Sequence, residues 1–202
     1  MNCYLIKTGS DYVLIDSSWS NKRASLEKEL MSVGCKIDNL KLIVLTHGDF
    51  DHSGNAAFIR KKYGAKIAMH FNDSRMVKHG DMFWNRRRSN IIIKVIAGLF
   101  LRKSDRFEPD IYINDGHDLS EYGFNAKVVH IPEHSKGSVG VLTTSGDLFC
   151  GDLLVNKGKP SFNTIIDDPA EANSSLNKLR QLNIGTVYPG HGKPFSMKML
   201  EE

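Results

Sequence analysis

The first half of the chain alternates short apolar runs with amphipathic stretches. Cys3–Ile6 and Tyr12–Ile15 are rich in strand-forming residues and flank a turn at Gly9, which predicts a β-hairpin. Asn21–Val33 carries apolar residues at helical spacing and is followed by Gly34, which predicts a helix that ends there. The chain therefore begins with a hairpin and a helix.

The alternation continues with a buried strand, a helix and another strand. These are expected at Lys41–Leu45, Asn55–Tyr63 and Ala65–Met69, with Gly64 ending the helix. In the second half, short strand candidates are joined by turns. They are Ala126–Ile131, Ser138–Thr144, Leu148–Cys150 and Thr186–Tyr188. Before the strand candidate Thr186–Tyr188, Asp168 as N-cap and Pro169 at the first helical position predict the start of a helix. The pattern predicts α/β layers with mixed sheets.

The stretch from about 72 to 106 differs from the rest. It is basic at Arg86–Arg88 and contains the most apolar run of the chain, Ile91–Leu101. This run is shorter than the about 20 apolar residues that cross a bilayer, so no stable membrane insertion is expected. We interpret 72–106 as a helical insertion in a single domain that covers residues 1–202. The segment 86–103 is expected to form a lid over the active-site groove, and a surface for a membrane or an acidic partner is the alternative.

Composition places the chain among ordinary globular proteins. Of its 202 residues, 41% are hydrophobic and 25% are charged. A net charge of +4 is too small to suggest a nucleic-acid partner. The three cysteines are odd in number and widely spaced, and no signal peptide is visible, so we expect a reducing, cytoplasmic location.

One short segment carries an unusual density of titratable side chains. THGDFDHSG contains His47, Asp49, Asp51 and His52 directly after the strand predicted at 41–45. Like charges repel, and a purely structural loop would gain little from this crowding. A bound cation offsets the repulsion, so we interpret these residues as metal ligands that need further partners.

Three later residues can supply those partners. His134, Asp152 and His191 each follow a predicted strand, so their loops can meet at one edge of a sheet. Four histidines and three aspartates exceed what one metal ion binds, which is about four to six ligands. The count indicates two divalent ions with a bridging carboxylate. Two such ions would bind a bridging water, lower its pKa and provide hydroxide near neutral pH.

The order and spacing of the motifs resemble the metallo-β-lactamase superfamily. The similarity is carried by THGDFDHSG, IPEHSKGSVG, CGDLL and YPGHG, together with LIDSS at Asp16. It extends from Asn2 to about Pro194. The resemblance implies a four-layer αβ/βα sandwich in which two mixed sheets are flanked by helices and the metals lie at one edge.

The resemblance also implies a role for each candidate residue. His47, Asp49 and His134 would bind the first metal, and Asp51, His52 and His191 the second. Asp152 would bridge the two ions. Asp16 would orient the site from behind the ligands.

Asp49 departs from the common family pattern H-x-H-x-D-H, which has a histidine at this position. A carboxylate makes the first site harder and raises its preference for iron or manganese. Zinc also accepts carboxylate ligands, so we expect two divalent ions with zinc first and iron or manganese as alternatives. Flavodiiron proteins of the superfamily place a glutamate here and use iron for redox chemistry.

These observations predict a dinuclear metal-dependent hydrolase that acts on a small-molecule substrate. A metal-bridging hydroxide would attack an ester, thioester, lactone, amide or phosphoester bond, and Asp51 would orient it and transfer a proton. A diiron protein with redox or oxygen-binding activity is the alternative, motivated by Asp49. A third reading is a metal site that only senses a ligand. The sequence predicts neither the substrate nor an oligomeric state.

Overall fold

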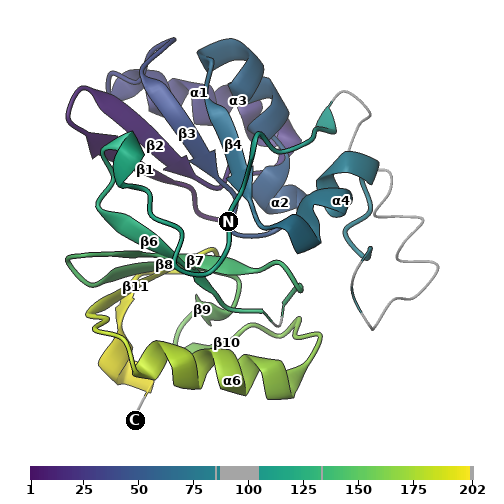
Figure 1. Cartoon of the computed structure of the whole chain (residues 1–202), viewed down its shortest axis with the longest axis vertical. Coiled ribbons are helices and arrows are strands. Elements are labelled where there is room, and N and C mark those ends of the chain that lie inside the picture. The colour runs from purple at the N-terminus through teal and green to yellow at the C-terminus, as the bar shows by residue number, and fades with distance from the viewer. Residues whose placement is uncertain (85, 87–104, 133, 201–202) are drawn as a thin grey trace.

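The computed structural model of the chain describes residues 1–84, 86, 105–132 and 134–200. Two five-stranded sheets and a separate pair of strands make up its β-structure. Each of the two large sheets has helices on its outer side (Figure 1).

The first sheet is formed by the first half of the chain, in the strand order β1-β2-β3-β4-β5. Its strands are β1 Tyr4–Thr8, β2 Asp11–Ile15, β3 Leu40–Val44, β4 Lys66–Met69 and β5 Ile111–Tyr112. The hairpin β1–β2 is antiparallel, whereas β2 to β5 run parallel to one another. Parallel neighbours need crossover connections, which the helices between these strands provide.

The second sheet has the order β12-β11-β8-β7-β6 and is also mixed. Its strands are β6 Ala126–His130, β7 Val139–Thr143, β8 Asp147–Gly151, β11 Thr186–Pro189 and β12 Phe195–Ser196. Only β8 and β11 are parallel in this sheet. The two-stranded sheet consists of β9 Leu154–Asn156 and β10 Pro160–Phe162.

Helices connect the strands and form the outer layers. The α-helices are α1 Arg23–Ser32, α2 Phe50–Ser53, α3 Ala56–Tyr63, α4 Phe71–His79 and α6 Pro169–Arg180. Short 3-10 turns are η1 Ser20–Lys22, η3 Ser120–Tyr122 and η4 Met197–Leu200. Within the described residues, no helix has the length and apolar character needed to cross a membrane.

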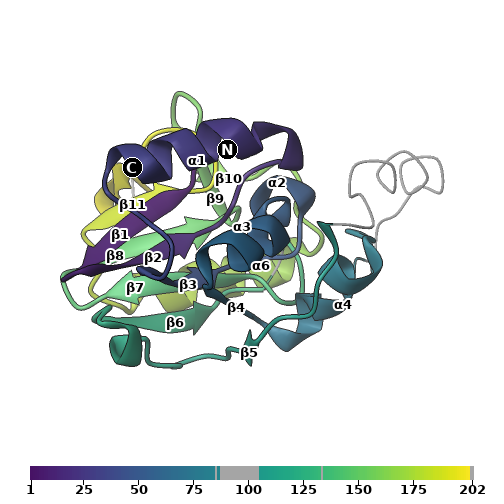
Figure 2. The same cartoon turned by 90° about the horizontal axis from the view of Figure 1, so that it is seen from above.

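Successive apolar side chains of a strand enter the cores on opposite faces of its sheet, and this holds the layers together. In β2, Leu14 belongs to the core beneath α1 and α3, while its neighbour Val13 belongs to the core between the two sheets. Strand side chains alternate between faces, so both faces of the first sheet are buried. Figure 2 shows α1 and α3 on the side of the first sheet away from β6, β7 and β8.

The fourth layer is α6, which covers the outer face of the second sheet (Figure 1). Leu176 and Leu179 of α6 pack with Leu148 and Val187 of the central strands. As expected from the sequence, the helix begins at Pro169, and Asp168 accepts hydrogen bonds from the first-turn N–H groups. The α/β sandwich with two mixed sheets and flanking helices is therefore confirmed.

The insertion expected at about 72–106 is described only in part. Helix α4 opens it, one residue earlier than expected, and Arg86 is described as a single residue. The apolar run Ile91–Leu101, with Arg87 and Arg88, lies outside the described residues. The lid and the single-domain organisation therefore stay predictions.

The contact between α6 and the second sheet gives a test of the packing. Leu179 is fully buried there, so Leu179→Ala should lower the free energy of unfolding by about 2–5 kcal/mol. Met31 on α1 is 66% exposed, so Met31→Ala should change it by less than about 0.5 kcal/mol. Urea unfolding monitored by circular dichroism measures both. An equal effect of the two variants would contradict the layer assignment.

Candidate metal centre

The candidate residues converge at one edge of the two sheets, beyond the carboxyl ends of several strands. The segment 46–53 follows β3, His134 follows β6, Asp152 follows β8 and His191 follows β11. Figures 1 and 2 show α2 and α4 on this side of the molecule. Loops at strand ends are a common place for ligand binding in α/β folds because the strands hold them rigidly.

The backbone after β3 becomes helical within the segment that carries the acids and histidines. Asp49 has extended torsions and is the N-cap residue of α2. The Asp49 carbonyl accepts hydrogen bonds from the N–H groups of His52 and Ser53, both at 2.9 Å, and this begins α2. Asp51 and His52 therefore reach the site from one turn of helix.

The structure brings all seven candidate ligands together in overlapping groups. Each group has ligand atoms within 4.8 Å of one another. The groups are His47, Asp49 and His134; Asp51, His52 and His191; and His47, His52 and Asp152. The first two are the sets expected for the two metals.

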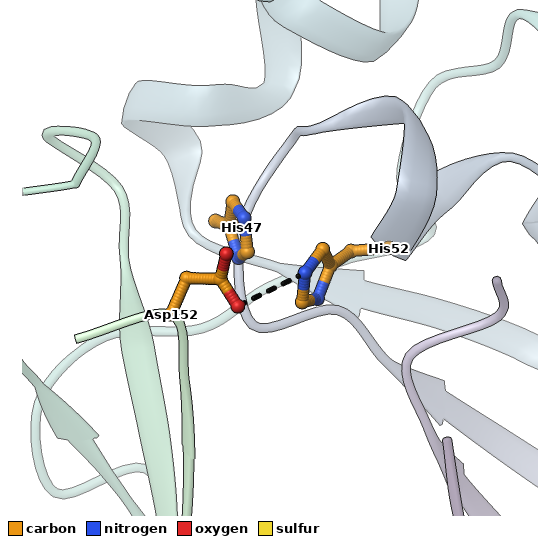
Figure 3. Close-up of side chains that lie close together, drawn as sticks. All are labelled: His47, His52 and Asp152. Atoms are coloured by element: carbon orange, nitrogen blue, oxygen red, sulfur yellow. Dashed lines mark ion pairs between the residues drawn. The ribbon is translucent and has the colours of Figure 1, made fainter. Parts of the chain in front are cut away.

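Asp152 lies between these sets. Its Oδ1 is 3.2 Å from His52 Nε2, and its Oδ2 is 3.5 Å from His191 Nε2 and 4.0 Å from His134 Nε2. Figure 3 shows its carboxylate facing the rings of His47 and His52. Both oxygens face histidines of the second set, and Oδ2 also faces His134 of the first set, so this carboxylate lies within reach of both sets.

Hydrogen bonds on the outer side of the rings fix the histidine tautomers. His134 Nδ1 is 2.7 Å from the carbonyl oxygen of Ile165, which can only accept, so Nδ1 carries the proton. His52 Nδ1 likewise donates to Asp16 Oδ2 at 2.8 Å. In neutral rings, both Nε2 atoms then present lone pairs to the centre, as metal ligation by histidine requires.

The same centre contains buried polar atoms without hydrogen-bond partners. Among the described residues, His47 Nε2, His52 Nε2 and Asp152 Oδ1 are buried and make no hydrogen bond, although the last two form an ion pair at 3.2 Å. Buried polar groups are nearly always hydrogen-bonded, so three orphans in one spot need an explanation. A cation that accepts lone pairs from all three provides it, and the residues therefore fit a metal.

Asp16 accepts hydrogen bonds that hold the histidines of this part of the site. Its carboxylate accepts hydrogen bonds from His52 Nδ1 and from the backbone N–H of Thr46 at 2.8 Å. The Thr46 hydroxyl donates to the same carboxylate and lies 3.0 Å from His47 Nδ1. One buried acid thus holds His52 directly and His47 through the Thr46 hydroxyl.

Charge pairing within the site shifts the pKa values of its acids. Burial would raise the pKa of Asp152, but the nearby imidazoles of His52 and His47 lower it below its ordinary value. Burial likewise opposes ionisation of Asp49, and Arg86 and His134 lower the pKa of this carboxyl well below its usual range. The pKa of Asp51 is also lowered against burial, mainly through the hydrogen bond from His191. The three acids are therefore anionic.

The pKa values of the buried histidines shift in opposite directions. Burial, reinforced by His52, lowers the pKa of His47 well below its ordinary value. For His52, burial is outweighed by Asp16 and Asp152, which raise its pKa well above that value. For His134, Asp49 overcomes burial and raises the pKa. Protons on His52 and His134 therefore occupy places that a metal ion can take.

Three residues that the sequence did not indicate hold the ligands or their loops in place through hydrogen bonds. Asn163 donates from Nδ2 to Asp152 Oδ2 at 2.9 Å and holds this carboxylate from outside. Asn2 donates to the carbonyls of Pro189 and Gly192 at 3.0 and 2.7 Å and so clamps the turn that carries His191. No motif marks either amide, because their partners are distant in sequence.

Asp73 is the third missed residue. It is fully buried in the first turn of α4. Its Oδ2 accepts from Gly48 N at 3.0 Å and from the Ser135 hydroxyl at 2.5 Å, and its Oδ1 accepts from Gly137 N at 2.8 Å. Asp73 therefore joins the loop of His47 to the loop of His134. An acid in the first turn of a helix looks like an ordinary helix-dipole residue in the sequence.

Arg86 contacts the site directly. Its guanidinium lies 2.8 Å from both carboxylate oxygens of Asp49. In the sequence, this residue opens the basic run Arg86–Arg88 of the segment expected to form a lid or a partner surface. In the structure, its side chain points toward the site and is 4% exposed.

Fold and site together define a metal-binding protein built from two mixed sheets with outer helices. The family model described as the metallo-beta-lactamase superfamily matches residues 2–191. The chain therefore belongs to the metallo-beta-lactamase superfamily.

Relatives with assigned names are similar over much of the chain. A probable metallo-hydrolase of Methanocaldococcus jannaschii is 26% identical over 196 residues, which cover 95% of this chain and 87% of the relative. Hydroxyacylglutathione hydrolase GloC of Haemophilus influenzae is 30% identical over 126 residues, or 59% of this chain and 52% of the relative. The Beta-lactamase-like protein 2 homolog of Caenorhabditis elegans is 24% identical over 202 residues, and the chain spans 58% of its length.

Solved structures share the fold. The crystal structure of TTHA1623 in a di-iron-bound form has a TM-score of 0.77 and 27% identity, and covers 100% of this chain and 92% of that one. A metallo-beta-lactamase family protein of Thermus thermophilus has a TM-score of 0.75 at 23% identity, over 99% of this chain and 72% of that one.

The role of Asp73 is testable through stability. Asp73→Asn leaves one acceptor oxygen and turns an NH₂ group toward N–H donors, so we expect a loss of about 1–3 kcal/mol. The matched control is Asp118→Asn, in which an exposed carboxylate that accepts one hydrogen bond from Ser120 N is changed. It should cost less than about 1 kcal/mol. Urea unfolding in the presence of a chelator measures both, and equal losses would rule out the loop-joining role.

Proposed function

We propose that this protein is a dinuclear metal-dependent hydrolase of small-molecule substrates. The observation that carries the proposal is the pair of ligand groups at one place, which Asp152 links because it groups with His47 of the first set and His52 of the second. In this link, buried His47 Nε2, His52 Nε2 and Asp152 Oδ1 have no hydrogen-bond partners. The metallo-hydrolase among the relatives supports the same class. When bound, two divalent ions would supply a water of lowered pKa and a Lewis acid for the scissile bond.

In this proposal, each set of residues holds one ion. His47, Asp49 and His134 hold the first, and Asp51, His52 and His191 hold the second. Asp152 would be shared by both, while Asn163 donates to its Oδ2, the oxygen that faces His191 and His134. Asp16 keeps the proton on His52 Nδ1, which leaves Nε2 available as a ligand.

Asp51 is the residue that we assign to proton transfer. Its side chain is 16% exposed, and its Oδ2 lies 3.1 Å from His191 Nε2, whose side chain is 22% exposed. The other candidate ligands are 7% exposed or less, so Asp51 and His191 mark the side open to solvent. A substrate would approach from there, and Asp51 can accept a proton from the attacking water.

The scissile bond is proposed only as a class: ester, thioester, lactone, amide or phosphoester. Hydroxyacylglutathione hydrolase and an atrochrysone carboxyl ACP thioesterase of Aspergillus fumigatus are among the relatives, so thioesters come first in a substrate panel. Zinc is the first choice of metal, with iron or manganese next. A cytoplasmic location is part of the proposal, and among the described residues the three cysteines form no disulfide.

Substitution of the acids tests the hydrolase. Asp152→Ala should remove the shared ligand and abolish turnover together with stable binding of two metals. Asp51→Asn should keep an oxygen ligand but lose the proton acceptor, lowering kcat roughly 10²–10⁴-fold. Activity on the panel and metal content by mass spectrometry are measured for folded protein, with Asp118→Asn as the control. Full activity of Asp152→Ala would refute the proposal.

A diiron redox protein is the second candidate. It is favoured by the carboxylate at Asp49 and by the di-iron-bound form of the similar TTHA1623. Metal analysis of protein isolated without added metal separates the two functions. Two iron ions per chain and a visible band that changes on reduction, with no turnover of the panel, would support the diiron protein. Zinc with turnover would support the hydrolase.

A further inference from the structure

Arg86 is buried against a candidate ligand of the first metal. Its Nη2 lies 2.8 Å from both Asp49 Oδ1 and Asp49 Oδ2, and its Nε donates to the backbone carbonyl of His134 at 3.0 Å. The two side chains are 4% and 7% exposed. Arg86 therefore touches two of the three residues of the first site, one through its side chain and one through its backbone.

The pairing leaves room for a metal. Arg86 contacts both oxygens of Asp49, and Oδ2 also faces His134 Nε2 at 2.9 Å and His47 Nε2 at 3.7 Å. Since His134 Nδ1 donates to Ile165, an ion between Oδ2 and the two Nε2 atoms is compatible with the arginine behind the carboxylate. His47, His134 and Asp49 would then hold the ion while Arg86 stays paired with Asp49.

Arg86 changes the net charge of the first site. With neutral imidazoles, the side chains of His47, His134 and Asp49 sum to −1, and Arg86 brings the sum to zero. The second set, Asp51 with two neutral imidazoles, also sums to −1 and has no cationic side chain bound to Asp51 among the contacts of the described residues. Asp152 is common to both. The two sites therefore differ by about one positive charge at close range.

We propose that Arg86 and Asp49 act as one charge-neutral unit that weakens cation binding at the first site, so that the second site fills first. Arg86 acts through Asp49 and is a positioning residue. The inference rests on the proposed two-metal site. A unit charge a few ångströms from a dication is a strong repulsion at the effective dielectric of a protein, so at least a tenfold effect on Kd is expected.

Two single variants change the charge of the first site in opposite directions, and a double variant restores it. Arg86→Met makes it −1 and should tighten the weaker binding step at least tenfold. Asp49→His makes it +1 and should weaken this step at least tenfold. The double variant Asp49→His with Arg86→Met returns the charge to zero and should bind within about threefold of wild type. A purely structural arginine predicts the reverse for Arg86→Met, because a disordered Asp49 would bind less tightly.

The experiment is a Zn²⁺ titration of the metal-free full chain against a chromophoric chelator. Wild type should show two affinities, and His191→Ala, which removes a second-site side chain, should weaken the tighter step. The control is Arg60→Met, which removes an arginine paired with Asp110 away from the site and should leave both steps unchanged. If Arg86→Met does not fold, Asp49→His and the double variant carry the test, because only a charge effect restores binding in the double variant. Circular dichroism checks folding of each variant.

The outcomes separate this inference from the proposed function. Two binding steps with Arg86→Met tightening the weaker one support the inference. Two steps with Arg86→Met unchanged or weaker, or with the double variant no tighter than Asp49→His, overturn it and leave the hydrolase standing. Wild-type protein that binds no Zn²⁺ overturns both.

Discussion

The structure depends on neutralising negative charge that is buried where the two sheets meet. Asp16, Asp49, Asp73 and Asp152 are 2%, 5%, 0% and 7% exposed. An isolated carboxylate in such a place is strongly unfavourable, so each one needs hydrogen-bond donors or a cation. Asp16 and Asp73 are supplied by N–H and hydroxyl groups of the chain. Asp49 has Arg86, whereas Asp152 keeps one oxygen without a hydrogen-bond partner. The remaining need for positive charge is therefore concentrated at the centre of the site.

This requirement also holds the loops together. The donors to each carboxylate come from other elements, so satisfying an acid fixes the distance between two strand ends. Asp16 after β2 joins Thr46 after β3, and Asp73 on α4 joins Gly48 to the Gly137 loop after β6. Gly190 adds a packing constraint, since a Cβ there would lie 2.7 Å from His52 Cε1. The ligands are thus held by rigid surroundings, which favours tight geometry.

Much of this could be predicted from local patterns. The strands that carry the site are apolar runs bounded by turns, and the helices α1, α3 and α6 end or begin at residues with known capping preferences. The short strands β5, β9, β10 and β12 were missed because two or three residues carry no periodicity. The seven candidate ligands could be found because each follows a strand. Asp73, Asn2 and Asn163 could not, because their function depends on partners far away in the sequence that only the fold reveals.

Arg86 shows why the motif alone does not indicate the metal. Read by itself, Asp49 in place of a histidine adds negative charge and favours harder ions such as iron or manganese. In the folded chain, the guanidinium contacts both oxygens of this carboxylate, so the added charge is largely compensated. What remains is one oxygen donor beside two imidazoles, a set that zinc accepts as readily as iron. The preference for a metal therefore follows from the pair of residues, of which only one lies in the motif.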